Sequence, residues 1–247
     1  MAIEDHKAVG VIPARAKSTR FPNKVIAPIL GKPMMQYIWE AAQNSKKLDR
    51  VIIATDDERV AAIGRGFGAE VVITPADLPT GSDRVALVAH DIKSRWVINL
   101  QADEPLLSAE SIDRLVQSLM DNPSFEIATF VVRKNDSEGL HNPNTVKAVG
   151  IVGGPAFYFS RQPLLSSISG EYLKHVGIYG YRSETLQRFC QLPPSELEKA
   201  ERLEQLRAME NNMPILLVEL ESDTIGVDVE SDVARVEKIL RSKERLS

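Results

Sequence analysis

The sequence predicts an α/β fold: a Rossmann-like, mostly parallel sheet with helices on both faces and an embedded antiparallel lobe. In the first half of the chain, short β-branched runs alternate with helical patterns, which is typical of a parallel sheet covered on both sides. After about residue 125, further strand-like runs follow one another without helices between them. That change in pattern indicates antiparallel pairing in the second half.

The expected strands are apolar runs bounded by turn or polar residues, each too short for a core helix. We expect buried strands at residues 8–12, 50–54, 70–73, 96–100, 127–132 and 215–220. Strands of the antiparallel addition are expected at residues 147–152, 156–159 and 174–181. Since ligands of parallel sheets lie beyond the carboxyl ends of the strands, a site is expected after residues 12, 54 and 100.

The expected helices lie at residues 34–44, 57–67, 84–92, 195–209 and 230–243. Ser195 and Glu198 have the spacing of a capping box at the start of the fourth of these helices. The glycines of residues 64–68 have the wrong spacing for a dinucleotide-binding loop and indicate a helix C-cap. Because no linker or repeat interrupts the chain, we expect a single domain over residues 1–247, with the lobe at about 130–222.

Composition limits the kinds of protein that this chain can be. The 247 residues include 30 basic and 34 acidic side chains, and a net charge of −4 does not favour a nucleic acid or a membrane surface as partner. Cys190 is the only cysteine, which excludes an internal disulfide and a cysteine-rich zinc site. The first residues do not read as a secretory signal, and no stretch approaches the ~20 apolar residues of a membrane span. We therefore expect a cytoplasmic protein.

A basic loop directly after the first strand is the strongest candidate for a binding site. It reads PARAKSTRFPNK at residues 13–24 and contains Arg15, Lys17, Arg20 and Lys24. Arginine forks suit phosphate oxygens and lysine supplies a movable point charge, so the loop could hold a nucleoside triphosphate. The alternative is a solvated basic loop with no ligand.

Two aspartates far apart in the chain predict a metal site. Asp103 lies in QADEP at residues 101–105, after an expected strand, and Asp228 ends the motif GVD at residues 226–228. Mg²⁺ prefers oxygen ligands and usually keeps waters or phosphate oxygens, so two carboxylates and a triphosphate could share one ion. The alternative is that Asp103 caps a turn or helix and Asp228 caps the final helix.

Short motifs along essentially the whole chain, taken in order, form a specific set. They are IPAR at 12–15, STR at 18–20, PNK at 22–24, GKPM at 31–34, ATDD at 54–57, GSDR at 81–84, QADEP at 101–105, NPNTVK at 142–147, YFSR at 158–161, HVGIYGY at 175–181, LEQLR at 203–207 and GVD at 226–228. With these motifs the chain resembles the CMP-Kdo synthetases, the 3-deoxy-manno-octulosonate cytidylyltransferases.

The resemblance implies a nucleotidyltransferase domain and a Mg²⁺-dependent reaction. CMP would pass from CTP to the anomeric 2-hydroxyl of 3-deoxy-manno-octulosonate (Kdo), releasing pyrophosphate, in lipopolysaccharide biosynthesis. It also implies a homodimer, with the lobe at 130–222 contributing the acceptor site and dimer contacts.

The resemblance also implies a role for each matching position. The nucleotide would contact Pro13, Ala14, Arg15, Arg20, Lys24, Gln101 and Ala102. Asp103 and Asp228 would bind the metal, and together with Lys24 they form the implied catalytic set. The sugar acid would contact Arg84, Gln101, Arg161, His175, Tyr179, Glu204 and Gln205. For His175 and Tyr179 the alternative is a purely structural role as hydrogen-bonded strand residues.

The chain departs from the family pattern at several positions. Asn23 and Ala102 each replace a usual glycine, Val229 stands where the family has threonine, and the segment between Arg161 and His175 is shorter than is typical. These departures leave other acceptors open, namely 8-amino-Kdo, another acid, or a phosphate or phosphonate. A further alternative is a nucleotide-binding regulator without catalytic activity.

Overall fold

The computed structural model describes residues 8–15, 21–163 and 170–244. The described chain divides into two units, each with its own strands and helices. The first contains the described residues up to Arg114 and those from Thr224 onward, and the second contains the residues from Leu115 to Asp223. The chain thus leaves the first unit within helix α4 (Ala109–Asp121) and returns to it after Asp223.

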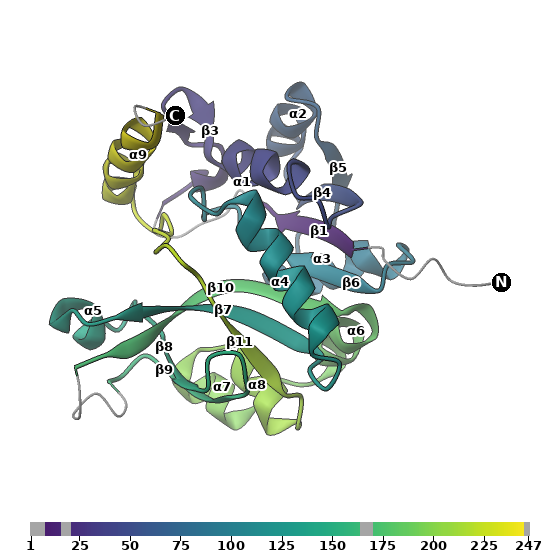
Figure 1. Ribbon diagram of the computed structural model, residues 1–247. Helices are drawn as coiled ribbons and strands as arrows, with labels where there is room; N and C mark the ends of the chain where they lie inside the picture. The colour runs from purple at the N-terminus through teal and green to yellow at the C-terminus, as the bar shows by residue number, and fades with distance from the viewer. Residues whose placement is uncertain (1–7, 16–20, 164–169, 245–247) are drawn as a thin grey trace. The chain divides into compact units, whose positions relative to one another are not determined.

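The first unit is built on four parallel strands with helices packed against them. The strands are β1 (Ala8–Pro13), β4 (Arg50–Thr55), β5 (Glu70–Ile73) and β6 (Trp96–Asn99), and the helices are α1 (Met34–Gln43), α2 (Glu58–Gly66) and α3 (Gly81–His90). The strand order is β6-β1-β4-β5. Figure 1 shows α1 and α2 on one side of these strands and α3 on the other, which explains why every residue of β1 is buried.

Two expectations for this unit are corrected by the structure. Residues 70–73 do form a strand, but β5 is not buried, because it is the last strand in the order and Ile73 is exposed. Helix α3 begins at Gly81 rather than at Arg84, because Thr80 and Asp83 form a capping box there. The predicted C-cap is confirmed, since Gly68 takes a φ of 91° just after α2.

The second unit is mainly antiparallel. Its strands are β7 (Ile127–Lys134), β8 (Lys147–Gly150), β9 (Ala156–Ser160), β10 (Tyr172–Arg182) and β11 (Ile215–Glu219). β10 pairs antiparallel with β7 and β8, β8 pairs antiparallel with β9, and β11 pairs parallel with β7. Together with the parallel strands of the first unit, this arrangement confirms the predicted fold class, a mostly parallel α/β fold with an antiparallel lobe.

A single helix over residues 195–209 is not what forms. Instead α7 (Glu196–Glu201) ends just before Arg202, which has a φ of 56°, and α8 (Gln205–Glu210) begins after it. A left-handed residue cannot continue a right-handed helix, so the chain turns at this point. The turn directs the carbonyl groups of Glu201 and Arg202 toward the guanidinium of Arg161, which donates hydrogen bonds to both.

In the part of the chain that the structure describes, three further α-helices form that the sequence pattern did not predict. They are α4 (Ala109–Asp121), α5 (Ser137–His141) and α6 (Ser183–Gln191), and the expected last helix is α9 (Glu230–Glu244). In α4 the buried residues Ile112, Leu115, Val116 and Leu119 have helical spacing, so its signal is present in the sequence. Among the described residues, no helix is both long and apolar enough to cross a membrane.

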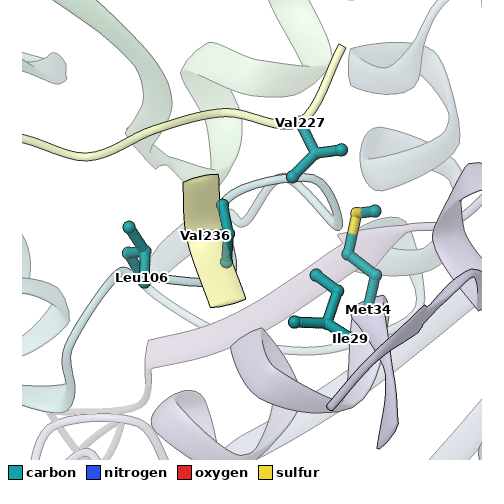
Figure 2. Close-up of a cluster of buried hydrophobic side chains, with 5 residues drawn as sticks. All are labelled: Ile29, Met34, Leu106, Val227 and Val236. Atoms are coloured by element: carbon teal, nitrogen blue, oxygen red, sulfur yellow. The ribbon is translucent and has the colours of Figure 1, made fainter. Parts of the chain in front are cut away.

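A buried apolar cluster in the first unit joins segments that are distant in sequence. It consists of Ile29, Met34, Leu106, Val227 and Val236, which are drawn in Figure 2. These residues come from the short strand β2 (Pro28–Ile29), the start of α1, the loop after β6, the segment before α9, and α9 itself. The cluster therefore fixes the segment that contains Val227 and Asp228 in the same unit as the loop after β6.

Candidate active site

The two aspartates predicted to bind a metal meet around the side chain of one lysine. Lys24 Nζ lies 2.5 Å from Asp103 Oδ2 and 3.6 Å from Asp228 Oδ1. The same ammonium donates a hydrogen bond of 3.1 Å to the carbonyl oxygen of Val227. The Lys24 side chain is 15% exposed, against 28% for Asp103 and 44% for Asp228, so the group can be reached from solvent mainly through the carboxylates.

Backbone contacts explain how a residue near the end of the chain reaches Asp103. The Val227 N–H donates a hydrogen bond of 2.9 Å to the carbonyl oxygen of Asp103, and the Val227 side chain is fully buried in the apolar cluster. The carboxylate of Asp232 accepts hydrogen bonds from the N–H groups of Asp228 and Val229 ahead of α9. Asp232, rather than Asp228, therefore accepts the N–H groups before α9. The Asp228 carboxylate lies toward Lys24 instead.

The residue before Lys24 explains one departure from the family pattern. Asn23 has φ 59° and ψ 21°, a left-handed conformation, and the short 3-10 helix η1 (Lys24–Ile26) starts directly after it. Glycine is the usual residue in this conformation, and asparagine is among the few others that tolerate it. Asn23 can therefore replace glycine here without changing the path of the chain that presents Lys24.

The rest of the basic loop is only partly described. The Arg15 guanidinium donates hydrogen bonds of 2.9 Å and 3.2 Å to the carbonyl oxygens of Leu78 and Pro79. Ala14 is fully buried, and its N–H donates to the carbonyl oxygen of Ala54 at 2.8 Å. Lys17 and Arg20 lie outside the described residues. The structure thus places Arg15 at this loop but leaves the predicted phosphate-binding set incomplete.

The other predicted nucleotide contacts surround the same strand ends. Pro13 is the last residue of β1 and is buried. Gln101 follows β6, and its side-chain amide donates a hydrogen bond of 2.9 Å to Asn99 Oδ1. Ala102 is also buried, so the methyl group that replaces the family's glycine is packed within the protein.

Arg84 is held within the first unit by two residues that sequence reasoning missed. It is fully buried, its Nη1 donates to the hydroxyl of Thr74, and its Nη2 lies 3.4 Å from the carboxylate of Asp56. Burial lowers the pKa of Arg84, the Asp56 carboxylate opposes that change, and nearby Arg15 adds to it. Asp56 belongs to the ATDD motif at residues 54–57. The motif was recognised in the sequence, but no role was predicted for Asp56.

In the second unit, a bulge gathers His175 and Tyr179 around Thr129. The β10–β7 register shifts between Val176 and Tyr179. The Thr129 hydroxyl oxygen lies 2.8 Å from the carbonyl oxygen of Ile178 and 2.9 Å from His175 Nε2. Since a carbonyl can only accept, the hydroxyl proton goes to it, and Nε2–H of a neutral imidazole donates to the hydroxyl. Thr129 was missed because a threonine inside a strand looks like any β-branched strand residue.

Burial sets the protonation states of His175 and Tyr179. The imidazole centroid lies 5.0 Å from that of Phe159 and 5.5 Å from that of Tyr179. Burial lowers the pKa of His175 to about 3, so the ring is neutral at physiological pH. Burial, together with the nearby Glu204 carboxylate, raises the pKa of Tyr179 well above 10. Tyr179 therefore keeps its proton and can donate it in a hydrogen bond.

The lowered pKa of His175 predicts a loss of stability in acid. Between the unfolded pKa near 6.5 and the folded value of about 3, only the unfolded chain binds the proton. The contribution is complete above pH 6.5 and should shrink by about 1.4 kcal/mol per pH unit as the pH falls below it. Urea unfolding of the wild type and of His175→Gln from pH 7.5 to 4.5 measures this difference. Parallel pH profiles of the two proteins would contradict it.

Arg161 and Gln205 occupy different surroundings in the second unit. Besides its contacts at the α7–α8 turn, the Arg161 guanidinium donates a hydrogen bond of 3.0 Å to the carbonyl oxygen of Pro143. The Arg161 N–H donates to the Glu201 carboxylate at 3.0 Å, and Lys147 Nζ donates to the Arg161 carbonyl at 2.9 Å. Gln205 is buried at the start of α8. Within this unit the structure brings Tyr179 together with His175 and Glu204, and it surrounds Arg161 with backbone carbonyls.

Comparison with known proteins identifies the relatives of this chain. Residues 9–216 match a family model described as cytidylyltransferase. The 3-deoxy-manno-octulosonate cytidylyltransferase of Bdellovibrio bacteriovorus is 43% identical over 245 residues, covering 96% of this chain and 99% of the relative. The protein of the same name from Geobacter sulfurreducens is 42% identical over 240 residues, covering 92% and 96%.

The chain belongs to the 3-deoxy-manno-octulosonate cytidylyltransferase family. A solved structure of CMP:2-keto-3-deoxy-manno-octonic acid synthetase complexed with CTP matches it with a TM-score of 0.90 and 38% identity, over 96% of this chain and 99% of the other. The 4-diphosphocytidyl-2C-methyl-D-erythritol synthase of Anaerococcus prevotii matches with a TM-score of 0.65 at 12% identity, over 97% and 98%, and shares the fold alone. The resemblance on the sequence motifs is thereby confirmed.

Membership of this family indicates a chemical use for the group formed by Lys24, Asp103 and Asp228. In a cytidylyltransferase the triphosphate must be held while its negative charge is neutralised, which calls for positive charge near the phosphates. The loop after β1, the loop after β6 and the segment before α9 bring Lys24, Asp103 and Asp228 together in the first unit.

Proposed function

We propose that this protein transfers CMP from CTP to the anomeric 2-hydroxyl of Kdo and releases pyrophosphate, with Mg²⁺ held by Asp103 and Asp228. The observation that carries the proposal is the meeting of these two carboxylates at Lys24 in a chain of this family. The relatives are named 3-deoxy-manno-octulosonate cytidylyltransferase, and the similar solved structure is named as a complex with CTP.

The residues around Lys24 fit a magnesium ion. Among the described residues no three His, Cys, Asp or Glu side chains gather as a metal cage. Mg²⁺ does not need such a cage, because it is commonly held by one or two carboxylates together with substrate phosphates. Asp103 and Asp228 supply two carboxylates that are partly exposed and that already surround a cation, the Lys24 ammonium. A bound Mg²⁺ would polarise the phosphates and neutralise charge on the pyrophosphate that leaves.

The chain's own cations would position the triphosphate. Lys24 and Arg15, and Arg20 outside the described residues, would pair with phosphate oxygens. Both substrates are anions, and two like charges 4 Å apart repel by about 4 kcal/mol at an effective dielectric near 20. Compensating that repulsion is a main task of the site. The sugar hydroxyl attacks the α-phosphorus directly, so no covalent enzyme intermediate is required.

The hydroxyl groups of the sugar acid need hydrogen-bond partners rather than charge. In the second unit, Tyr179 retains its proton and His175 is neutral, held by Thr129 through Nε2. A tyrosine hydroxyl and the remaining nitrogen of the imidazole suit this purpose. We propose that His175 and Tyr179, with Glu204 beside them, contact the acceptor. The role of Arg84 as an acceptor contact, which the family resemblance implies, stays a prediction.

An omission series tests the proposed reaction. Pyrophosphate release is measured with CTP, MgCl₂ and Kdo together and with each left out in turn. We expect release only with all three, and release without Mg²⁺ would contradict the proposed metal. Equal mixtures of Kdo with 8-amino-Kdo, and of Kdo with an alcohol phosphate, measure acceptor choice. CTP binding without release across all acids would instead support a regulatory protein.

The cellular setting is part of the proposal. We propose a cytoplasmic homodimer, as the family resemblance implies. With a single cysteine the chain cannot form an internal disulfide, which suits a reducing compartment. Sedimentation equilibrium of the purified protein at micromolar concentration should give twice the 27.4 kDa of the chain.

A further inference from the structure

The three oxygen groups that contact the Lys24 ammonium could also bind a metal ion. It contacts Asp103 Oδ2 at 2.5 Å, the Val227 carbonyl oxygen at 3.1 Å and Asp228 Oδ1 at 3.6 Å. Two carboxylates and a carbonyl are the oxygen donors that hard cations prefer. An ammonium and a divalent cation at the same carboxylates would repel each other, so each makes the other's position less favourable.

The backbone on both sides of this contact is held in place. The Lys24 N–H donates to the carbonyl oxygen of Phe21 at 3.2 Å, and the Ala27 N–H donates to the Lys24 carbonyl oxygen at 3.0 Å. Val227 is fixed by its bond to the Asp103 carbonyl and by its burial. Any exchange of partners at this point is therefore confined to the four-carbon side chain of Lys24, which is long and rotatable.

Phosphate oxygens offer the ammonium a second partner. A triphosphate bound beside Lys24 supplies oxygens with which the lysine forms charge-assisted hydrogen bonds. If the side chain turns to these oxygens, it leaves the two carboxylates, and their full negative charge is then available to a divalent cation. If it stays, the ammonium balances half of that charge.

We propose that Lys24 couples metal binding to nucleotide binding by competing with the divalent cation for Asp103 and Asp228. The nucleotide removes this competitor when its phosphates take the ammonium. Metal ion alone then binds weakly and nucleotide strengthens it, and by thermodynamic linkage the metal strengthens nucleotide binding equally. This inference rests on the metal site proposed above, and it assigns Lys24 a task in addition to holding phosphate.

Binding of Mn²⁺, followed by the relaxation of water protons around the protein-bound ion, tests the coupling without any turnover. In the absence of nucleotide, Lys24→Met should bind Mn²⁺ at least about tenfold more tightly than the wild type, because the competing charge is gone. Lys24→Arg keeps a positive charge and should bind as weakly as the wild type. Asp228→Asn in the Lys24→Met background should abolish the gain.

Lys32→Met is the matched control. Lys32 lies in the same unit and pairs with Glu40 at 2.7 Å, so the Mn²⁺ affinity of Lys32→Met should equal that of the wild type. Lys24→Gln and thermal unfolding of each variant check that the gain does not come from a changed fold. Unchanged or weaker binding by both Lys24→Met and Lys24→Gln would overturn the inference.

A further arm with CTP separates this inference from the proposed function. If wild-type protein with CTP binds Mn²⁺ and Asp228→Asn abolishes that binding, the metal site stands whatever the Lys24 variants do. If Mn²⁺ does not bind at Asp228 even with CTP, the proposed metal site itself is wrong, and the coupling is wrong with it.

Discussion

Asp103→Asn lowers the rate of pyrophosphate release by about 10³-fold, which corresponds to ~4 kcal/mol of transition-state stabilisation. The change replaces a carboxylate by a neutral amide of nearly the same shape, so the metal loses a charged ligand. It also removes the closest partner of Lys24, whose ammonium lies 2.5 Å from Asp103. Asp228→Asn has the same direction, because that carboxylate faces the same ammonium at 3.6 Å. Initial rates at saturating CTP and Kdo measure both.

The control for this prediction is an aspartate of the same unit outside the site. The Asp91 side chain is almost fully exposed and pairs with His90, so Asp91→Asn should leave the rate unchanged. Circular dichroism and thermal unfolding should show that all three variants keep the fold. Full activity of Asp103→Asn or of Asp228→Asn would remove the assigned metal role from that residue.

Arg207→Met lowers the free energy of unfolding by about 3–5 kcal/mol, the usual cost of removing one partner of a buried ion pair. The buried Arg207 guanidinium donates hydrogen bonds of 2.8 Å and 2.6 Å to the two carboxylate oxygens of Glu198 and lies 4.8 Å from the centre of the Phe189 ring. Methionine keeps part of the packing but leaves the Glu198 carboxylate, which is only 13% exposed, without its cation. Urea unfolding at pH 7 measures the change.

A second ion pair of α7 provides the comparison. Lys199 and Glu196 lie 2.8 Å apart on the exposed side of this helix, and Lys199→Met should not change the unfolding midpoint measurably. Arg207→Met and Lys199→Met each remove the cation of one ion pair, and the two pairs differ in burial. A larger loss of unfolding free energy in Arg207→Met is therefore due to burial. A loss below about 1 kcal/mol for Arg207→Met would show that the pair does not stabilise the helix junction.

Strand positions and most helix positions could be predicted because their signals are local. A β-branched run such as residues 50–54 favours an extended chain, and β4 forms there. Exposure is different, because it depends on neighbours. Residues 70–73 have the same kind of composition, yet β5 lies last in the strand order of its unit and Ile73 remains exposed.

The helix pattern at residues 195–209 shows where local signals fail. Its residues favour helix throughout, but Arg202 takes a left-handed conformation, and the carbonyl groups on either side of it bind the guanidinium of Arg161. That contact joins residues about forty positions apart in the sequence. No pattern within the helix could have predicted it.

The candidate site, like the fold, has features that the sequence predicts and features that depend on the tertiary structure. Its chemistry was readable in the chain itself: lysine and arginine after the first strand, a carboxylate after QA at residues 101–102 and another after GV at residues 226–227. Residue type and motif order alone therefore determined the family and the groups available to hold a triphosphate and a metal.

Only the tertiary structure decided which of these groups meet. Burial of Val227 with Ile29 and Leu106 draws the late aspartate to the earlier one, and both carboxylates then share the Lys24 ammonium. Likewise, the bulge in β10 decides that Thr129 holds His175. The reason is physical: apolar burial and strand pairing act between segments that come together only when the chain folds, and no window of sequence contains both partners.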